Sequence, residues 1–394
     1  MLKNIKVLSL SIENIRCFEN TKMLFSDKQP SVIIGANASG KTTILQLIAL
    51  GLRGINDVPS YYGWQYVNRY KEKNGKFGLE ILEDDKIHRV CFQIDSEDII
   101  EVIEGKDFIE SLEKENLLIN AYGVNRTIPT RYAEYLNNFD SIGSLFDHND
   151  CLHMKDYSSE QKLSREKSFK IIKRVINKIF SQIDPYLGIV FETCLINSLL
   201  FKHKNGVELP AESIPESFKG ILSWLFDTLI RMLEKSENIE TKNVNGIILI
   251  DEVDIHLSLT AQRKILPILT KVFPNIQFIV SSNSPFVAQS INENIIKVMT
   301  KNGLSETSKL EECEGISYHA LIREIFDISD YNIDIEKKLD KIDIILHNAL
   351  LKEPYDEKKL RGMILSLAKK GCEVEGLLRR KLMSLKHQGI EIKL

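Results

Sequence analysis

The sequence predicts an α/β fold in which a central sheet carries a nucleotide site, followed by a helical C-terminal region. Three observations support this prediction. A glycine-bounded loop, residues 35–42 (GANASGKT), stands between two apolar segments. A second apolar run, residues 246–250, ends in two adjacent carboxylates. Beyond residue 300 the apolar residues follow helical spacing.

The loop 35–42 has the pattern G-x-x-x-x-G-K-[ST], in which glycines at both ends let backbone N–H groups converge on phosphate oxygens. Lys41 can reach the β- and γ-phosphates, and Thr42 can offer its hydroxyl to Mg²⁺. A β-branched run before the loop and a periodic helix after it favour this function over a glycine-rich turn without a ligand. We expect ATP with Mg²⁺ to bind here, through Gly35, Asn37, Ser39, Gly40, Lys41, Thr42 and Thr43.

Composition sets broad bounds on the class of protein. The 394 residues are 43% hydrophobic and 27% charged, which is ordinary for a globular chain. The net charge of -3 gives no general attraction to nucleic acid. The six cysteines lack paired spacing, and no apolar run reaches the roughly 18 residues of a membrane span. We therefore expect reduced thiols and a cytoplasmic protein without a membrane partner.

The N-terminal third is expected to be rich in strands. Residues 5–14 partly alternate apolar and polar side chains, and residues 22–25 can return as a second strand. The runs 78–82 and 89–94 are separated by polar turns, which is typical of an antiparallel meander.

The middle of the chain is expected to be helical. Residues 160–205 have apolar side chains at helical spacing, with many lysines and arginines on the other sides. Such a face can follow a phosphate backbone or an acidic partner, although it is more often a solvated surface. His148, Cys151 and His153 lack an obvious fourth metal ligand, so we interpret them as ordinary loop residues.

The second chemical centre is the run 246–252 (GIILIDE). Its consecutive apolar residues predict a buried parallel strand with two carboxylates at its end, a Walker B arrangement. Asp251 would hold Mg²⁺ through water opposite Thr42, and Glu252 would polarise the attacking water as general base. A helix over residues 260–272 followed by another apolar strand predicts a βαβ unit.

Several motifs resemble ABC-type ATPases of the RecF, Rad50/SMC and OLD group, and the AAA_21-like branch in particular. They are N-I-R-C-F (14–18), D-E-V-D-I-H-L (251–257) and F-P-N-I-Q-F-I-V-S-S-N-S-P (273–285). The resemblance implies an ABC-type head over residues 1–300, with a mixed sheet, flanking helices, an antiparallel β-subdomain and a helical insertion at about 150–240. It also makes Arg16 a candidate nucleotide contact, with a surface arginine as an equal alternative. The metal-sensing glutamine stays unassigned, since nothing around Gln93 singles it out.

Two departures from the family pattern predict that ATP is bound but hydrolysed slowly or not at all. Asn283 stands where these ATPases carry a switch histidine, and an amide cannot exchange a proton in the required range. The segment 214–218 (IPESF) matches the signature loop poorly. There Pro215 removes a backbone N–H, and Ser217 replaces a glycine that approaches phosphate. We expect Glu252 and Asn283 to be the residues closest to any chemistry.

The resemblance extends to the ATPase subunits of bacterial anti-phage systems of the Septu and retron-associated kind. It implies an ATPase without its own nuclease, because residues 377–394 are too few for the nuclease domain that OLD proteins carry. We expect head-to-head self-association, a separate HNH-type nuclease subunit that binds the helical region 301–394, and potential contact with DNA or RNA. The alternatives are a RecF-like or SMC-like DNA clamp for repair and, with least support, the motor of an ABC transporter.

Overall fold

A computed structural model of the chain forms two compact units, residues 1–318 and 319–394, each considered by itself below. The residues described by the structure are 4–28, 30–53, 74–95, 99–114, 117–124, 145–146, 162–186, 188–195, 198–210, 213–235, 241–291, 293–301, 303–310, 322–323, 331–351 and 353–387. The predicted boundary at residue 300 is wrong, because it falls inside β13 (Ile295–Lys301), a strand of the first unit's main sheet.

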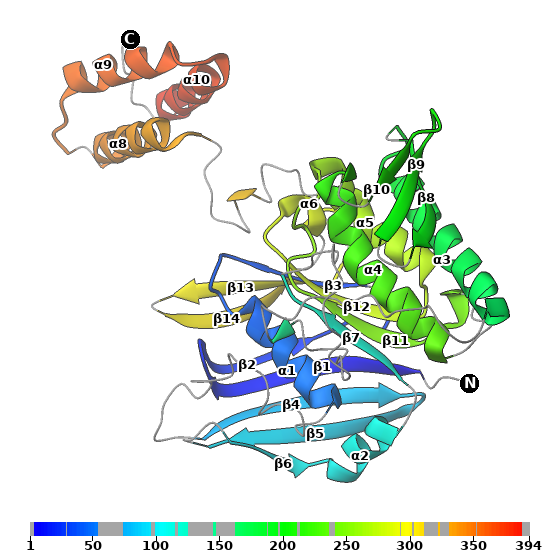
Figure 1. Cartoon of the computed structure of the whole chain (residues 1–394). Coiled ribbons are helices and arrows are strands. Elements are labelled where there is room, and N and C mark those ends of the chain that lie inside the picture. The colour runs from blue at the N-terminus through cyan, green and yellow to red at the C-terminus, as the bar shows by residue number, and fades with distance from the viewer. Residues whose placement is uncertain are drawn as a thin grey trace. The chain divides into compact units, whose positions relative to one another are not determined.

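The main sheet has six strands in the order β14-β13-β3-β12-β11-β7 (Figure 1). All neighbours are parallel except β13 and β14, so the predicted mixed sheet is confirmed. Four adjacent strands, β3, β12, β11 and the edge strand β7, are fully buried, which explains their continuous apolar runs. Besides β13, the strands are β3 (Ser31–Gly35), β7 (Leu118–Tyr122), β11 (Gly246–Ile250), β12 (Ile276–Ser282) and β14 (Leu304–Leu310).

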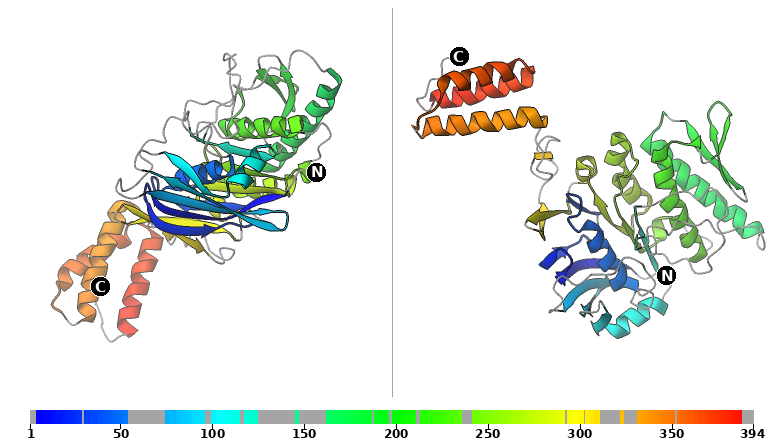
Figure 2. Two further views of the ribbon diagram at one scale, coloured as in Figure 1. Left: turned by 90° about the horizontal axis from the view of Figure 1, so that it is seen from below. Right: turned by 60° about the vertical axis from the view of Figure 1, so that its left-hand side comes forward.

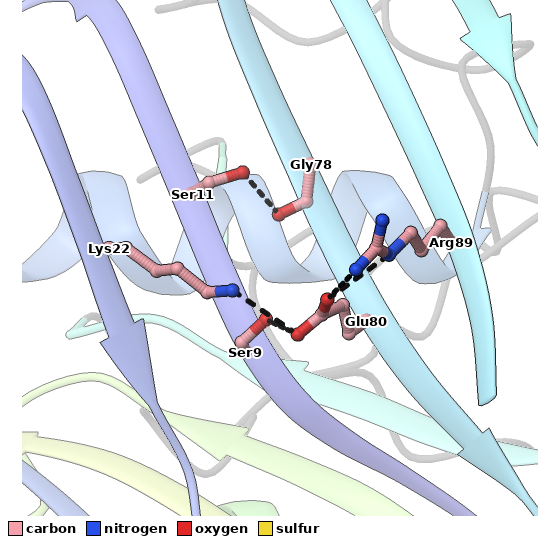
Figure 3. Close-up of polar contacts among 6 residues, drawn as sticks. All are labelled: Ser9, Ser11, Lys22, Gly78, Glu80 and Arg89. Carbon is pink, nitrogen blue, oxygen red and sulfur yellow. Dashed lines mark hydrogen bonds and ion pairs between the residues drawn. The ribbon is translucent and has the colours of Figure 1, made fainter.

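A second sheet is antiparallel, in the order β2-β1-β4-β5-β6, which confirms the predicted N-terminal strands and meander. Its polar face carries a cluster around Glu80, which accepts hydrogen bonds from Ser9 (2.7 Å), Lys22 (3.4 Å) and Arg89 (3.2 Å) (Figure 3). The Ser9 hydroxyl is the main cause that lowers the pKa of Glu80. The strands are β1 (Ile5–Ile15), β2 (Phe18–Leu24), β4 (Gly75–Glu83), β5 (Lys86–Ile94) and β6 (Ile100–Glu104), with helix α2 (Lys106–Lys114) packed on β5.

Helix α1 (Lys41–Arg53) lies between the two sheets (Figure 1). It contacts β4 and β5 on one side and β12 and β7 on the other, so nearly all of its residues are buried. The sheets are also joined by Gln277 of β12, whose side chain donates to the Val7 and Ser26 carbonyls and accepts from the Val7 N–H. The helix that follows the glycine-bounded loop is therefore held on both faces.

Helices α3 (Lys162–Ile183), α4 (Glu216–Lys235) and α5 (Leu259–Val272) pack together on the side of the main sheet opposite α1 (Figures 1 and 2). The α5 helix and the parallel strands β11 and β12 form the predicted βαβ unit. Two short helices, η4 (Thr241–Asn243) and α6 (Pro285–Ala288), also belong to this unit.

The prediction that residues 160–205 are helical is wrong beyond α3. The chain instead forms a small antiparallel sheet of β8 (Ile189–Leu195), β9 (Ser198–His203) and β10 (Glu208–Pro210). Gly188, with φ +67°, turns the chain out of the helix. Phe191 and Phe201 lie opposite each other in the hairpin, with ring centroids 5.4 Å apart, and both are fully buried. Aromatic packing against the helices therefore outweighs the helical spacing of this segment.

The second unit contains α8 (Ile333–Leu350), α9 (Glu357–Ala368) and α10 (Cys372–His387), so the predicted helices of the C-terminal region are confirmed. Most of the expected start of this region, residues 314–326, lies outside the described residues. Lys381 of α10 is paired with Asp343 of α8. The apolar core consists of Leu339, Ile342, Leu346, Leu360, Ile364, Leu367, Val374, Leu378 and Leu385.

Across both units, none of the described helices combines the length and the apolar character that crossing a bilayer requires.

Candidate functional site

The loop between β3 and α1 has the backbone that its sequence predicts. Gly40 has φ +99° and Ala38 has φ 62°, so both lie in the left-handed region that turns the chain tightly. A Cβ on Gly35 would lie 2.4 Å from the Val298 carbonyl oxygen of β13, so only glycine fits there. Asn37 is exposed at the crown of the loop, whereas Ser39 is buried within it. The predicted loop residues are thus gathered at one end of the main sheet.

Lys41 is buried, with 5% of its surface exposed, and curls back onto its own loop. Its ammonium donates to the carbonyl oxygens of Gly35 (2.9 Å) and Ala36 (2.8 Å). Burial lowers the pKa of Lys41, and the nearby carboxylates of Glu252 and Asp251 oppose that shift. A cation held only by neutral carbonyls gains from exchanging them for the oxygens of an anion, because charge-assisted hydrogen bonds are stronger.

One direct contact connects the predicted Walker B site to the predicted phosphate-binding loop. Thr42 donates from Oγ1 to Oδ2 of Asp251 over 2.8 Å, although 209 residues separate them in sequence. Strands β3 and β11 are both parallel neighbours of β12, so their carboxyl ends lie at the same edge of the sheet. A hydroxyl and a carboxylate are the hard oxygen donors that Mg²⁺ prefers, and the remaining ligands would be phosphate and water. This donor set therefore fits Mg²⁺ bound with a nucleotide.

Glu252 and Asn283 are also brought together. The Asn283 side-chain amide donates from Nδ2 to Oε1 of Glu252 over 3.1 Å. The Oδ1 atom of Asn283 is buried and accepts no hydrogen bond from any described residue. Glu252 itself has φ 45°, a left-handed conformation that is uncommon for a non-glycine residue. The amide can orient the Glu252 carboxylate, but it cannot accept a proton from it.

Arg16 is half-buried against the start of α1 rather than lying on the surface. Its Nη1 donates to Thr43 Oγ1 (3.1 Å) and Gln46 Oε1 (3.0 Å). Gln46 in turn donates to the Leu145 carbonyl over 3.0 Å. Arg16 and Thr43 therefore contact each other beside the loop, and a contact of either with nucleotide stays a prediction.

The signature-like segment 214–218 forms the entry to α4. Ile214 and Phe218 are buried, while Pro215 and Glu216 are exposed. One turn later, Gly220 faces the segment after the Walker B strand, since a Cβ there would lie 3.4 Å from the Ile255 carbonyl oxygen. The entry of α4 is thus packed close to the Walker B turn of the same chain.

Two serines at the end of β12 had no assigned role in the sequence. Ser281 donates to Asp251 Oδ1 (2.5 Å), and Ser282 donates to Asp254 Oδ1 (2.6 Å). In the sequence, two hydroxyl side chains follow the apolar residues of this strand. Hydroxyl groups buried at the end of a strand require hydrogen-bond partners, so this pattern could have indicated their contacts. The earlier candidates His148, Cys151 and His153 lie outside the described residues.

Tyr122 stands in a Y-G-x-x-R stretch that resembles the AAA_21-like branch, but the sequence assigns it no chemical role. Its carbonyl accepts a hydrogen bond from the Asp251 N–H (2.8 Å), and its hydroxyl lies 2.8 Å from both Asp227 Oδ2 and Thr228 Oγ1 of α4. Asn120 donates to the same hydroxyl over 2.9 Å. A buried polar cluster therefore connects the Walker B turn to the helix that follows the signature-like segment.

The sequence matches the AAA_21 family, described as "AAA domain, putative AbiEii toxin, Type IV TA system", over residues 31–288. It is similar to "Retron Vc95 probable ATPase" of Vibrio cholerae serotype O1 biovar El Tor, with 22% identity over 388 residues that cover 75% of this chain and 74% of that protein. It is also similar to "Septu protein PtuA" of Bacillus mycoides (strain KBAB4), with 24% identity over 367 residues. That alignment covers 89% of this chain but about half (48%) of the Septu protein.

Among solved structures, an SMC head bound to the C-winged helix domain of ScpA is similar, with a TM-score of 0.53 and 14% identity. The match covers 78% of this chain and 98% of that chain. At this identity the likeness concerns the fold alone, and that fold is an ABC-type P-loop ATPase head, as the sequence predicts. The resemblance to AAA_21-like ATPases of the Septu and retron-associated kind is confirmed. Because the family match spans well over half of the 394 residues, the chain belongs to the AAA_21 family of ATPases.

Proposed function

We propose that this protein binds ATP with Mg²⁺, hydrolyses it slowly or not at all, and uses the bound state to gate or scaffold a separate nuclease in bacterial anti-phage defence. The contact between Thr42 and Asp251 carries the nucleotide part of this proposal, because it pairs the two expected Mg²⁺ ligands beside the buried Lys41. The similarity to a retron ATPase and to a Septu protein supports the defence part.

Slow turnover follows from the residues around Glu252. Its carboxylate accepts a hydrogen bond from the Asn283 amide, which cannot take part in proton transfer as a histidine at position 283 could. The surface that would complete the site on another copy, residues 214–218, lacks the glycine and one backbone N–H expected there. The first feature acts on the chemical step, and the second weakens the contact that another copy would make with the phosphates, while Lys41, Thr42 and Asp251 on this chain are unaffected by either.

The test is to measure ATP binding and hydrolysis side by side for the wild type, for Lys41→Ala and for the control Lys28→Ala, which changes an exposed lysine. We expect Lys41→Ala to weaken ATP binding by about 100-fold or more, since it removes a charge-assisted contact with phosphate. Lys28→Ala should bind as the wild type does. A wild-type kcat of about 1 s⁻¹ or above would overturn slow turnover, and equal binding by all three proteins would overturn the ATP site.

The partner is proposed to be an HNH-type nuclease that binds the second unit, with the first unit associating head to head with another copy. One face of α8 supports this, because Ile333, Ile344 and Leu351 are 67%, 61% and 59% exposed. They are 11 and 7 residues apart, which places them on one side of the helix. The core residues Leu339, Ile342 and Leu346 occupy the other side.

Co-purification with the product of the neighbouring open reading frame tests the partner. We expect Ile344→Ser to reduce recovery of the nuclease strongly, while Lys338→Ser, on an exposed position of the same helix, leaves it unchanged. Deletion of residues 330–394 should abolish recovery. Recovery at the wild-type level with both Ile344→Ser and the deletion variant would show that the nuclease does not bind this unit. Sedimentation with and without ATP tests the head-to-head association.

A second candidate function, a DNA-binding clamp for repair, is favoured by one observation on α3. Lys170, Arg174 and Lys178 are all exposed and repeat every four residues, so they form one basic stripe. If the stripe binds DNA or RNA, affinity should fall steeply with salt, and replacing all three residues by Gln should reduce that slope by about 3. DNA-stimulated ATP turnover would favour the clamp over the scaffold.

A further inference from the structure

Ser281 contacts both residues of the Walker B pair, the carboxylate of Asp251 and the backbone of Glu252. It lies near the end of β12 and has no exposed surface. Its hydroxyl donates to Oδ1 of Asp251 (2.5 Å) and accepts the backbone N–H of Glu252 (2.7 Å). One side chain, 30 residues away in sequence, thus contacts both residues on which metal binding and water activation would depend.

The hydroxyl fixes the rotation of the Asp251 carboxylate. A serine has one hydrogen to donate, and here it is directed at Oδ1. The other oxygen, Oδ2, then faces the Thr42 hydroxyl. The Asp251 backbone is held independently, because its N–H donates to the Tyr122 carbonyl. The orientation of the carboxylate is therefore set by two hydroxyls, Ser281 at Oδ1 and Thr42 at Oδ2, and of these only Ser281 lies outside the expected metal ligands.

The same hydroxyl also supports the conformation of Glu252. The left-handed backbone at φ 45° turns this residue away from the strand direction, at a cost of order 1 kcal/mol. The hydrogen bond from the Glu252 N–H to Ser281 stabilises that turn. The turn directs the Glu252 side chain to Asn283, which binds its carboxylate.

We propose that Ser281 is a positioning residue that sets the Mg²⁺ affinity of the nucleotide site by holding Asp251 Oδ2 toward Thr42. The inference rests on the proposed function, since it requires that ATP and Mg²⁺ bind together here. Groups that orient a metal ligand typically change metal affinity by 10–100-fold when they are removed. Ser281 acts through Asp251 and does not itself bind the metal.

Ser282 provides a matched control on the same strand. It is equally buried, and its hydroxyl makes an equally short bond, 2.6 Å, but to Asp254 instead of Asp251. It also accepts the backbone N–H of Ser284, so removing either hydroxyl deletes two hydrogen bonds, one donated to a carboxylate and one accepted from a backbone N–H. The proposal predicts that only the loss of Ser281 changes the response to Mg²⁺.

The experiment uses the full chain and a fluorescent ATP analogue at saturating concentration. The Mg²⁺ concentration that produces half of the metal-dependent change is compared for wild type, Ser281→Ala, Ser281→Thr and Ser282→Ala. Affinity for the analogue is measured separately in EDTA. We expect Ser281→Ala to raise the Mg²⁺ midpoint about 10-fold or more. Ser281→Thr, which keeps the hydroxyl, and Ser282→Ala should resemble the wild type, and affinity in EDTA should be equal in all four.

An unchanged midpoint in Ser281→Ala, or an equal rise in Ser282→Ala, would overturn the proposal. If Ser281→Ala does not fold, Ser281→Cys replaces it, because the thiol has a similar size but is a weak donor, and the same rise is required. A wild-type protein that binds the analogue without any response to Mg²⁺ would instead contradict the proposed function. The two failures are therefore distinguishable.

Discussion

The two walls of the nucleotide site are built in different ways. On the wall formed by the loop 35–42, the shape comes from the backbone, and the one charged side chain, Lys41, contacts only carbonyl oxygens of its own loop. On the acidic wall after β11, the shape comes from side chains of another strand, because Ser281 binds Asp251 and Ser282 binds Asp254.

This difference separates the part of the site that must rearrange from the part that is already in place. The Lys41 ammonium directs two of its three N–H donors to the Gly35 and Ala36 carbonyls, so it must redirect these donors to make more than one hydrogen bond to phosphate. Asp251, in contrast, already faces the Thr42 hydroxyl, with both carboxylate oxygens hydrogen-bonded. Preorganised ligands lower the cost of binding a metal, so we expect the acidic wall to change little when nucleotide binds and the loop wall to change more.

The largest effect is expected from a Cβ on the loop wall. Gly40→Ala would force a left-handed alanine, with its Cβ 2.5 Å from Cys17 Sγ and 2.7 Å from the Phe18 ring. We expect loss of measurable ATP binding and about 2–4 kcal/mol lower free energy of unfolding, from strain and overpacking. Calorimetric ATP titration and urea denaturation measure both quantities.

Gly362→Ala is the control for this variant, because it lies within α9 with no atom within 4 Å of the added Cβ. It should bind ATP normally and be more stable by about 0.5–1 kcal/mol, since alanine favours the helix. Normal ATP binding by Gly40→Ala would show that the shape of the loop wall does not depend on that glycine.

A smaller and more selective effect is expected on the acidic wall. Asp251→Asn keeps the size of the side chain, but its single acceptor oxygen can receive only one of the hydrogen bonds from Thr42 and Ser281, and it lacks the charge that Mg²⁺ requires. We expect affinity for ATP in EDTA to stay within a few-fold of the wild type, while the Mg²⁺ midpoint rises by at least about 100-fold, beyond the range for a group that only orients a ligand. Asp254→Asn, on the same wall, should leave the midpoint unchanged. A similar rise of the Mg²⁺ midpoint in both variants would mean that Mg²⁺ responds to the total negative charge of the acidic wall and not to Asp251 in particular.

The same contrast explains what could be predicted from the sequence. The loop wall is local in the chain, so Gly35, Gly40, Lys41 and Thr42 stand in one motif, and so does the acidic pair after its apolar strand. The βαβ pattern also predicts that the loop and the acidic pair lie close together, because the carboxyl ends of parallel strands lie at one edge of the sheet. These predictions needed only spacing and burial.

The supports of the acidic wall could not be predicted in this way. Ser281 and Tyr122 are about 30 and 130 residues from Asp251, and no fixed spacing connects a strand to the side chains of its neighbours. The hairpin at 189–203 could not be predicted for a related reason. Its strands are stabilised by aromatic packing on α3 and α4 and not by an alternation of apolar and polar residues. Long-range packing decided each of these features.

Tyr122→Phe tests whether the acidic wall depends on its connection to α4. The variant keeps the ring and the carbonyl that binds Asp251, but it leaves Asn120 and Asp227 without the hydroxyl between them. We expect a loss of about 1–3 kcal/mol in the free energy of unfolding, the usual cost of unpaired buried groups. Tyr186→Phe, at a residue that is 95% exposed, is the control and should leave stability unchanged.

The mutant should also differ from the wild type in alkali. Burial raises the pKa of Tyr122 well above its usual value near 10, so the folded state keeps this proton when the unfolded state has lost it. The stability that Tyr122 contributes is therefore complete below pH 10 and falls as the pH rises further. Above pH 10, the free energy of unfolding should fall more steeply with pH in the wild type than in Tyr122→Phe. If the free energy of unfolding depends on pH equally in both proteins, the Tyr122 hydroxyl is not isolated from water.

An effect of similar size, but limited to alkaline pH, is expected just before β12, where Lys6 of β1 donates to the Asn275 carbonyl over 2.5 Å. Burial lowers the pKa of Lys6 from 10.5 to about 8, so the folded state releases this proton before the unfolded state does. Stability should therefore rise between pH 8 and pH 10.5 in the wild type, by about 1–3 kcal/mol, and this rise should be absent in Lys6→Met. Lys76→Met, on an exposed position of β4, should keep it. Because Lys6 contacts the start of β12 and the serines lie at its other end, the Mg²⁺ midpoint should not change in Lys6→Met. A changed midpoint would mean that the acidic wall depends on the whole strand and not only on its last residues.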